Sequence, residues 1–170
     1  TPLMRNHSAM GTRVQEAYRF EKIDGFRHII SMRYKLLPYL YSEYMKAVLR
    51  DEMMFRPLAF DYPEDRRAVK VEDQLLLGDG MMIAPVYEQN AEGRYVYLPE
   101  RMKLVRFKED GTKEEEILEK GDHYVEVALT DVIFFIRPDH LIPMATGGQC
   151  VDEVDFDHPE CIGFVENVAE

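Results

Sequence analysis

The feature that most constrains the fold is a broad apolar stripe between residues 26 and 50. Apolar side chains recur there at three- and four-residue spacing, which predicts an amphipathic helix. Asp24 is the expected N-cap, and Pro38 is expected to kink or split the helix near Leu37. A helix with so wide an apolar face needs an extensive partner surface. The stripe includes Phe26, Ile29, Ile30, Leu37, Leu40, Tyr41, Tyr44, Met45 and Val48.

The second half of the chain alternates apolar and polar residues with the period of two that is typical of strands. Two of these strands flank Glu109–Thr112, a sequence suited to a hairpin turn. Regular spacing, with turns between the segments, predicts an antiparallel sandwich. The expected strands are residues 94–99, 104–108, 116–118, 124–129 and 132–137.

The segment between the helix and these strands has a mixed character. Residues 53–62 form an apolar run that predicts a buried strand, and Pro57 favours a strand start or an edge position. Residues 71–77 are compatible with a short helix that ends at the glycines following them. Residues 81–86 are expected to form another short strand.

A compositional change near residue 80 predicts two units, residues 1–80 and residues 81–170. The residues from Pro159 onward are weakly patterned and are expected to fray. The residues alone therefore indicate an α+β chain without a recognisable catalytic motif.

The charge of the chain narrows its possible partners. Acidic residues outnumber basic ones 32 to 21, and the formal net charge is −11. Nucleic acids and anionic membranes favour basic surfaces, so neither is expected as a partner. Neutral ligands such as sugars remain open.

The two cysteines, Cys150 and Cys161, are expected to be plain thiols, which fits a cytoplasmic protein. No apolar run reaches the length of about 18 residues that a membrane helix needs. No cysteine and histidine pair has metal-ligand spacing, and no glycine loop suits a phosphate, so neither a metal nor a cofactor is expected. The chain opens with Thr1 inside a polar motif, which is the pattern expected of a fragment.

Four short motifs follow one another in the first half of the chain. They are Met-Arg-Asn-His at residues 4–7, Arg-Tyr-Lys-Leu-Leu-Pro-Tyr-Leu-Tyr at 33–41, Phe-Arg-Pro-Leu at 55–58, and Glu-Asp-Gln-Leu-Leu-Leu-Gly at 72–78 leading to Ile-Ala-Pro-Val. Each is weakly specific alone, but in this order they resemble glycoside hydrolase family 31. The strands at 94–99 and before Arg137 resemble the family's proximal C-terminal sandwich more loosely.

The resemblance implies that residues 1–80 are the end of a (β/α)8 catalytic barrel, with its eighth strand near residues 55–62, and that residues 81–170 are the sandwich. Members of the family hydrolyse α-glycosides with retention, using an aspartate nucleophile and an aspartate acid/base. Both precede the Arg-Asn-His motif. The resemblance thus implies that this chain carries neither and is inactive alone.

His7 and Arg5 are the candidate substrate-binding residues. In the family, the histidine matching His7 hydrogen-bonds hydroxyls of the sugar that is cleaved. An imidazole can offer one donor and one acceptor to neighbouring hydroxyls. Arg5 would share a face with His7 in an extended strand and could orient it. A structural role remains the alternative for both residues.

Other residues favour structural roles. Arg56, before Pro57, is interpreted as a salt-bridge partner inside the barrel, and the tyrosines of the helix as packing residues. Family members usually carry a proline near the position of Ile133 and a glycine near Asp139 or His140, which are absent here. The usual turn in that strand is therefore in doubt.

Two hypotheses follow for function. The first is part of a retaining α-glucosidase whose partner in the intact enzyme is an α-glucoside oligosaccharide. The second is a non-catalytic interaction or carbohydrate-binding module derived from such an enzyme. In either case the stripe on residues 26–49 is expected to pack on the remainder of the barrel. Alone, the chain is expected to self-associate or to leave residues 1–80 loosely ordered.

Overall fold

The computed structural model describes residues 7, 9–13, 16–19, 21 and 23–166. A short 3-10 turn, η1 (Ala17–Arg19), precedes two helices, α1 (Ile23–Lys35) and α2 (Leu37–Arg50). The helices meet at Leu36, because Pro38 in the first turn of α2 has no backbone N–H to continue the ladder of α1. The predicted break is thus confirmed. Asp24 lies inside the first turn of α1 and not before it, and it pairs with Arg27.

The centre of the fold is a six-stranded sheet in the order β1-β2-β3-β8-β5-β6, in which all neighbours pair antiparallel. The predicted hairpin at residues 104–118 is confirmed, and Gly111 adopts a φ of 86° in its turn. The strands are β1 (Phe55–Pro57), β2 (Leu75–Leu77), β3 (Met81–Ile83), β5 (Met102–Phe107), β6 (Lys113–Leu118) and β8 (Val132–Ile136).

This sheet is buried on both faces. Consecutive residues of its inner strands belong to different hydrophobic clusters, since strand side chains alternate between faces. Phe135, for example, lies in one cluster, whereas its neighbour Phe134 lies in the other. Two-sided burial explains why β2, β3 and β8 are continuous apolar runs with no polar alternation.

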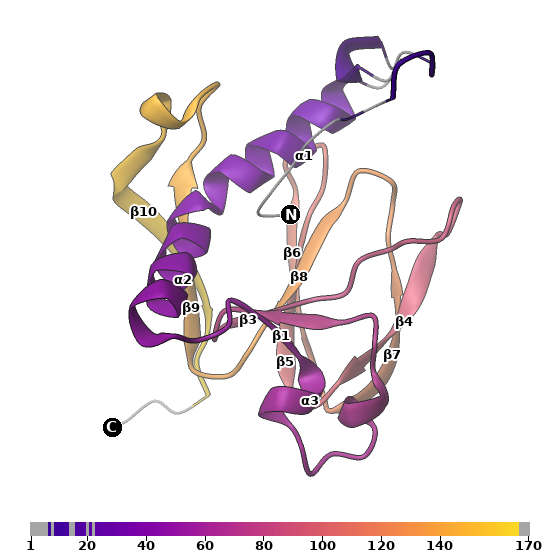
Figure 1. The fold of residues 1–170 in the computed structure, drawn as a ribbon, viewed down its shortest axis with the longest axis vertical. Helices are drawn as coiled ribbons and strands as arrows, with labels where there is room; N and C mark the ends of the chain where they lie inside the picture. Colours follow the sequence, from indigo (N-terminus) through magenta and orange to yellow (C-terminus); the bar gives the residue numbers. More distant parts are fainter. Residues whose placement is uncertain (1–6, 8, 14–15, 20, 22, 167–170) are drawn as a thin grey trace.

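Two pairs of antiparallel strands cover the two faces of the sheet (Figure 1). The hairpin of β9 (His140–Thr146) and β10 (Asp155–Phe164) lies beside α2 and shares one cluster with both helices. The antiparallel pair of β4 (Gly93–Leu98) and β7 (Gly121–Glu126), which are separated in sequence by β5 and β6, covers the other face. A short helix, α3 (Leu58–Asp61), and a 3-10 turn, η2 (Ala68–Lys70), complete that second cluster. A further 3-10 turn, η3 (Val151–Glu153), lies between β9 and β10.

A buried glutamine connects the central sheet to the β4–β7 strand pair. The Gln74 side-chain nitrogen donates to the Tyr97 carbonyl over 2.7 Å, and the Tyr97 backbone nitrogen donates to the Gln74 side-chain oxygen over 2.8 Å. One side chain therefore satisfies both backbone groups of Tyr97, as a neighbouring strand would.

Three assignments made from the sequence are wrong. Residues 71–77 contain strand β2 and not a helix, since three consecutive leucines suit a strand that is covered on both faces. The run at 53–62 holds only the three-residue strand β1, because Pro57 ends it and α3 begins at Leu58. β1 pairs antiparallel with β2, so it is not a parallel strand of a barrel.

The C-terminal residues also differ from expectation. The segment from Glu160 to Phe164 is paired with β9, and Phe164 is buried in the cluster of the helices. The boundary predicted at residue 80 falls in the turn between β2 and β3, which are hydrogen-bonded neighbours. The central sheet is therefore continuous across that boundary.

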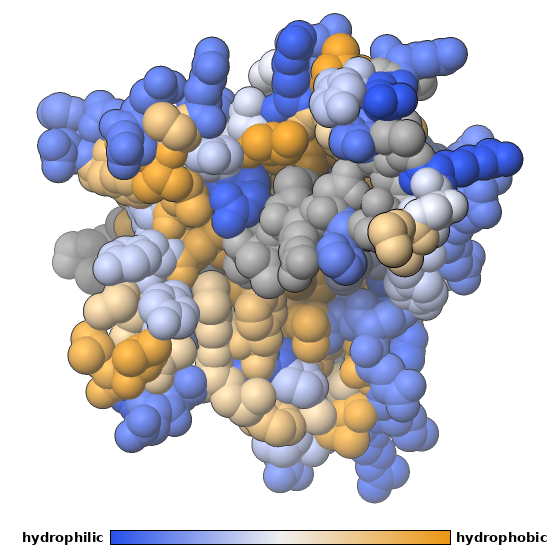
Figure 2. All heavy atoms as spheres, turned by 45° about the horizontal axis from the view of Figure 1, so that its top comes forward, coloured by the Kyte–Doolittle hydropathy of each residue, from blue (hydrophilic) through white to orange (hydrophobic). Residues whose placement is uncertain are grey.

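The helical stripe is covered in part by the chain itself. Leu40, with Met32 and Tyr39 beside the stripe, is buried in the cluster that also holds Met144 and Phe164. Tyr44 and Val48 remain more than half exposed. The expectation that the whole stripe lacks cover is thus wrong for its central part. Hydrophobic residues still gather across the middle of one face of the molecule (Figure 2).

This packing makes a test of how α2 is held. Leu40→Ala should lower the free energy of unfolding by about 2–5 kcal/mol, because Leu40 is 7% exposed and its loss leaves a cavity against β9. Leu49→Ala on the same helix, where the side chain is 76% exposed, should change it by less than about 0.5 kcal/mol. Urea unfolding measures both, and equal effects would show that α2 is not docked as described.

Candidate functional site

The two residues predicted to bind substrate lie at the N-terminal end of the chain. His7 is exposed and precedes α1, in a stretch without regular secondary structure. Arg5 lies outside the described residues.

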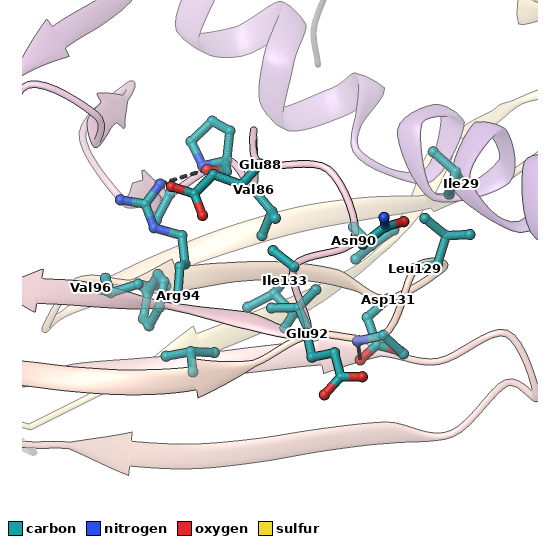
Figure 3. Close-up of a pocket in the computed structure, with 18 residues that line it drawn as sticks. Ile29, Val86, Glu88, Asn90, Glu92, Arg94, Val96, Leu129, Asp131 and Ile133 are labelled. Carbon is teal, nitrogen blue, oxygen red and sulfur yellow. Dashed lines mark hydrogen bonds between the residues drawn. The ribbon is translucent and has the colours of Figure 1, made fainter.

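A hollow of roughly 810 Å³ lies between the loop that follows β3, the end of β7 and the strand β8 (Figure 3). Its lining is largely apolar and includes Ile29 of α1, Leu129 and Ile133. Acidic and basic groups at its edge come from Glu92, Arg94 and Asp131 among others. Concave, mainly apolar hollows with a few polar groups are the usual form of small-molecule sites.

Two charged groups of this hollow, Arg94 and Asp131, are already fixed by the fold. Arg94 donates to the Pro85 carbonyl over 2.5 Å and to the Tyr95 carbonyl over 3.1 Å, and it pairs with Asp73. Asp131 accepts from Arg106 over 2.8 Å and from the Ala128 backbone nitrogen over 3.1 Å. These groups shape and orient the hollow, and their hydrogen-bonding capacity is largely used in doing so.

The densest polar cluster joins β1, α3 and the turn between β2 and β3. Arg56 contacts Asp61 through two hydrogen bonds, of 2.8 and 3.1 Å, and it reaches Asp79 at 3.3 Å. Arg137, after β8, pairs with Glu100 at 2.7 Å and with Asp61 at 3.3 Å. The interpretation of Arg56 as a salt-bridge partner is confirmed, but the pair lies in the sheet domain and not inside a barrel.

The same cluster anchors α2. Lys46 bridges Glu43 and Asp79, both at 2.7 Å, and Glu43 accepts from the Asp79 backbone nitrogen. Gly78 sits against Glu43 with a φ of 64°, and a β-carbon there would meet the Glu43 side chain at 2.3 Å. A glycine is therefore required at this turn for the helix to approach.

Tyr39 makes the third link between α2 and the turn. Its hydroxyl donates to the Leu77 carbonyl over 2.6 Å and accepts from the Gly80 backbone nitrogen over 3.2 Å. Sequence reasoning missed this link, because it took the glycines after residue 77 as the end of a helix and found no glycine loop suited to a phosphate. The two glycines flanking an aspartate were the available signal for a tightly packed turn.

The cluster is suited to holding structure and not to transferring protons. A hydrogen bond from Lys46 lowers the pKa of Asp79 below its usual value. Burial raises the pKa of the Tyr39 hydroxyl, and burial with a hydrogen bond to Glu100 raises that of Tyr62. The carboxylate is thus ionised and both phenols are protonated across the physiological range, whereas general acid–base groups have pKa values near the working pH.

Among the described residues, no group of three or more histidine, cysteine, aspartate or glutamate side chains is placed to hold a metal ion. No helix within that part of the chain is long and apolar enough to cross a membrane.

Two consecutive family matches cover most of the chain. Residues 1–43 match the glycosyl hydrolases family 31 TIM-barrel domain, and residues 51–142 match the glycosyl hydrolase family 31 C-terminal domain. The fold is thus that of an antiparallel sheet domain attached to the end of a TIM-barrel domain. The chain belongs to glycosyl hydrolase family 31.

The sequences of individual glucosidases agree with this family assignment. The lysosomal alpha-glucosidase of Bos taurus is 40% identical over 101 residues, covering 58% of this chain and 11% of the relative. A probable alpha/beta-glucosidase of Arthroderma benhamiae is 32% identical over 146 residues, covering 84% and 16%. The chain therefore spans less than a fifth of the length of these two relatives.

Solved structures resemble the fold to a similar extent. The α-xylosidase of Xanthomonas citri, a member of the same family, has a TM-score of 0.70 at 25% identity, covering 94% of this chain and 17% of its own. A dextranase of Flavobacterium johnsoniae, in complex with isomaltotriose, has a TM-score of 0.66 at 31% identity, covering 80% and 16%.

The Asp79 cluster predicts a pH dependence of stability. A carboxyl whose pKa is lowered by folding stabilises the fold above its ordinary pKa of 3.8, and this contribution is lost as the pH falls through the lower, folded value. Asp79→Asn should remove that part of the slope between about pH 5 and about pH 3. Lys46→Met, which removes the main cause of the shift, should do the same. Urea midpoints across this range measure it, and an unchanged slope in both variants would contradict it.

Proposed function

We propose that this chain is the C-terminal part of a retaining α-glucosidase of family 31, and that its catalytic aspartates belong to residues outside these 170. The observation that carries the proposal is the order of the two family matches, with the barrel match at 1–43 followed by the C-terminal match at 51–142. Retaining hydrolysis needs two carboxyl groups on either side of the glycosidic bond.

The proposed substrate is an α-linked glucoside oligosaccharide. Curated relatives from mammals, a fungus and a bacterium are named alpha-glucosidases or alpha/beta-glucosidases, which supports glucose as the sugar that is recognised. The dextranase relative was solved with isomaltotriose, a glucose oligomer, whereas the α-xylosidase relative is named for xylose substrates.

His7 is the proposed substrate contact, and Arg5 is the proposed residue that orients it. In this proposal the imidazole hydrogen-bonds hydroxyls of the glucose unit whose bond is cleaved. The exposed position of His7 supports the proposal, since an exposed imidazole can reach a sugar bound by the rest of the enzyme. Arg5 lies outside the described residues, so its role rests on the motif alone.

The remaining residues form the support of the site in this proposal. In this proposal the barrel ends after Arg50 and the sheet domain begins before Phe55, and the membership of β1 in the central sheet supports that boundary. The exposed apolar side chains of α2, which are Tyr41, Tyr44, Val48 and Leu49, are the surface that packs on the remainder of the barrel.

The alternative is a non-catalytic interaction or carbohydrate-binding module. The hollow behind Arg94 and the exposed face of α2 are the features that favour it. Sequencing the coding region upstream of Thr1 separates the two, since an open reading frame encoding a barrel with both aspartates supports the enzyme.

The isolated 170-residue chain should not hydrolyse p-nitrophenyl α-glucoside. Positioning of a sugar without a nucleophile and an acid provides no route to the oxocarbenium-like transition state. The full-length parent, assayed in parallel, should release p-nitrophenol. Turnover by the isolated chain above a mock-purified blank would overturn this proposal.

In the full-length parent, His7→Ala should lower kcat/KM by the equivalent of about 2–4 kcal/mol of transition-state stabilisation, the scale of losing one positioned polar contact. The thermal midpoint should change little, because His7 is exposed. A large fall in the midpoint with normal kinetics for the remaining folded protein would assign His7 a structural role instead.

A further inference from the structure

We propose that a tyrosine-lined cleft on the outer face of the β4–β7 strand pair binds a neutral oligosaccharide. The cleft encloses roughly 480 Å³ and lies between the loop after β3 and the two strands. Its lining combines three tyrosines, Tyr87, Tyr95 and Tyr124, with carboxylate side chains and Arg94. Neither the sequence motifs nor the ionic cluster of α2 involves these tyrosines.

The aromatic rings of the cleft are available to a ligand. All three rings line the same cleft, and each remains more than half exposed. Tyr87 is 69% exposed, Tyr95 is 71% exposed and Tyr124 is 53% exposed. Tyr95 and Tyr124 are directly opposite across the two strands, with their ring centroids 5.3 Å apart in an edge-on arrangement. A cross-strand tyrosine pair stabilises the association of β4 with β7, but Tyr87 comes from the preceding loop and takes no part in that pairing.

The backbone is shaped to receive the Tyr124 ring. A β-carbon on Gly93 would lie 2.9 Å from the Tyr124 ring and 2.5 Å from the Val125 carbonyl oxygen. Gly93 therefore allows the ring to lie across the neighbouring strand. The Tyr124 side chain is thus part of the cleft wall and does not lie in a buried core.

The polar groups of the cleft are fixed before any ligand binds. The Arg94 side chain is only 12% exposed and is bonded to the Asp73 carboxylate and to three backbone carbonyls beside the cleft, while its guanidinium lies 5.5 Å from the centre of the Tyr87 ring. The Tyr87 hydroxyl also donates to Asp73 over 3.3 Å. This network holds Tyr87 in position, so little conformational freedom is lost on binding.

The chemistry of the cleft favours a sugar over other ligands. Pyranose rings present a hydrophobic C–H face and a rim of hydroxyl donors, which match exposed aromatic rings bordered by carboxylate acceptors. Asp73, Glu88 and Glu92 supply such acceptors. The same carboxylates, in a chain of net charge −11, repel phosphate groups and other anions. An uncharged, hydroxyl-rich oligomer is thus the ligand that the cleft suits.

The cleft is inferred from its own geometry, and only the choice of α-glucose oligomers as probes rests on the proposed function. The test uses the whole chain labelled with 3-fluorotyrosine, since ten tyrosines give a small set of fluorine signals. Titration with maltotetraose and with isomaltotriose should shift the signals of Tyr87, Tyr95 and Tyr124, each assigned by a tyrosine-to-phenylalanine variant. Sodium phosphate at equal concentration should leave them unchanged.

Variants make the test specific. Tyr87→Ala and Tyr95→Ala should each weaken binding by about tenfold, the scale expected from loss of one aromatic contact. Tyr18→Ala is the matched control, because Tyr18 is 71% exposed on η1 and does not line the cleft. It should leave the affinity unchanged. Tyr87 lies outside the strands, so its variant remains informative if Tyr95→Ala disturbs the pairing of β4 with β7.

Three outcomes would overturn the proposal. They are fluorine signals that ignore both sugars, a response to phosphate as strong as that to sugar, and cleft signals that shift with protein concentration instead. The last would identify a contact between copies of the chain. Activity of the full-length parent reports separately on the proposed function. An active parent with a silent cleft removes only this inference, whereas a responsive cleft in an inactive parent removes only the α-glucosidase.

Discussion

Burial of the central sheet on both faces is the constraint from which the rest of the structure follows. Each inner strand sends alternate side chains into two clusters, so each face needs its own covering layer. One layer is α1 and α2 together with β9 and β10, and the other is the β4–β7 strand pair with α3 and η2. The ionic cluster around Arg56, Asp79 and Arg137 then fixes the sheet to α2 at one edge.

How far the sequence predicts this fold depends on which physical signal each segment carries. The break at Pro38 and the 104–118 hairpin were predictable, because a missing N–H and a turn glycine act locally. The strand at Leu75–Leu77 was not, since its three leucines are explained only by cover on both faces. The pairing of β10 depends on a partner strand and not on its own pattern, so the expectation of fraying was wrong for Glu160–Phe164.

The candidate sites divide in the same way. His7 and Arg5 came from a motif, and the structure adds only the exposed position of His7. The Asp79 cluster and the tyrosine cleft both assemble residues from segments that are distant in the sequence, such as Lys46 with Asp79 and Asp73 with Arg94. No spacing rule could have joined them. Arg56 was the exception, because a charged residue inside an apolar run already indicates a buried ion pair.

The shared cluster of α1, α2 and β10 has a consequence for how the chain is made. Met32 and Phe164 pack in one core although most of the chain separates them. On the ribosome, the helices are synthesised first and their covering hairpin last, so one face of the molecule stays open until synthesis of this stretch is nearly complete. Contacts between such distant segments also slow folding, because a long loop must close before they form. The β4–β7 side, whose segments are nearer in sequence, is therefore the half that can order first.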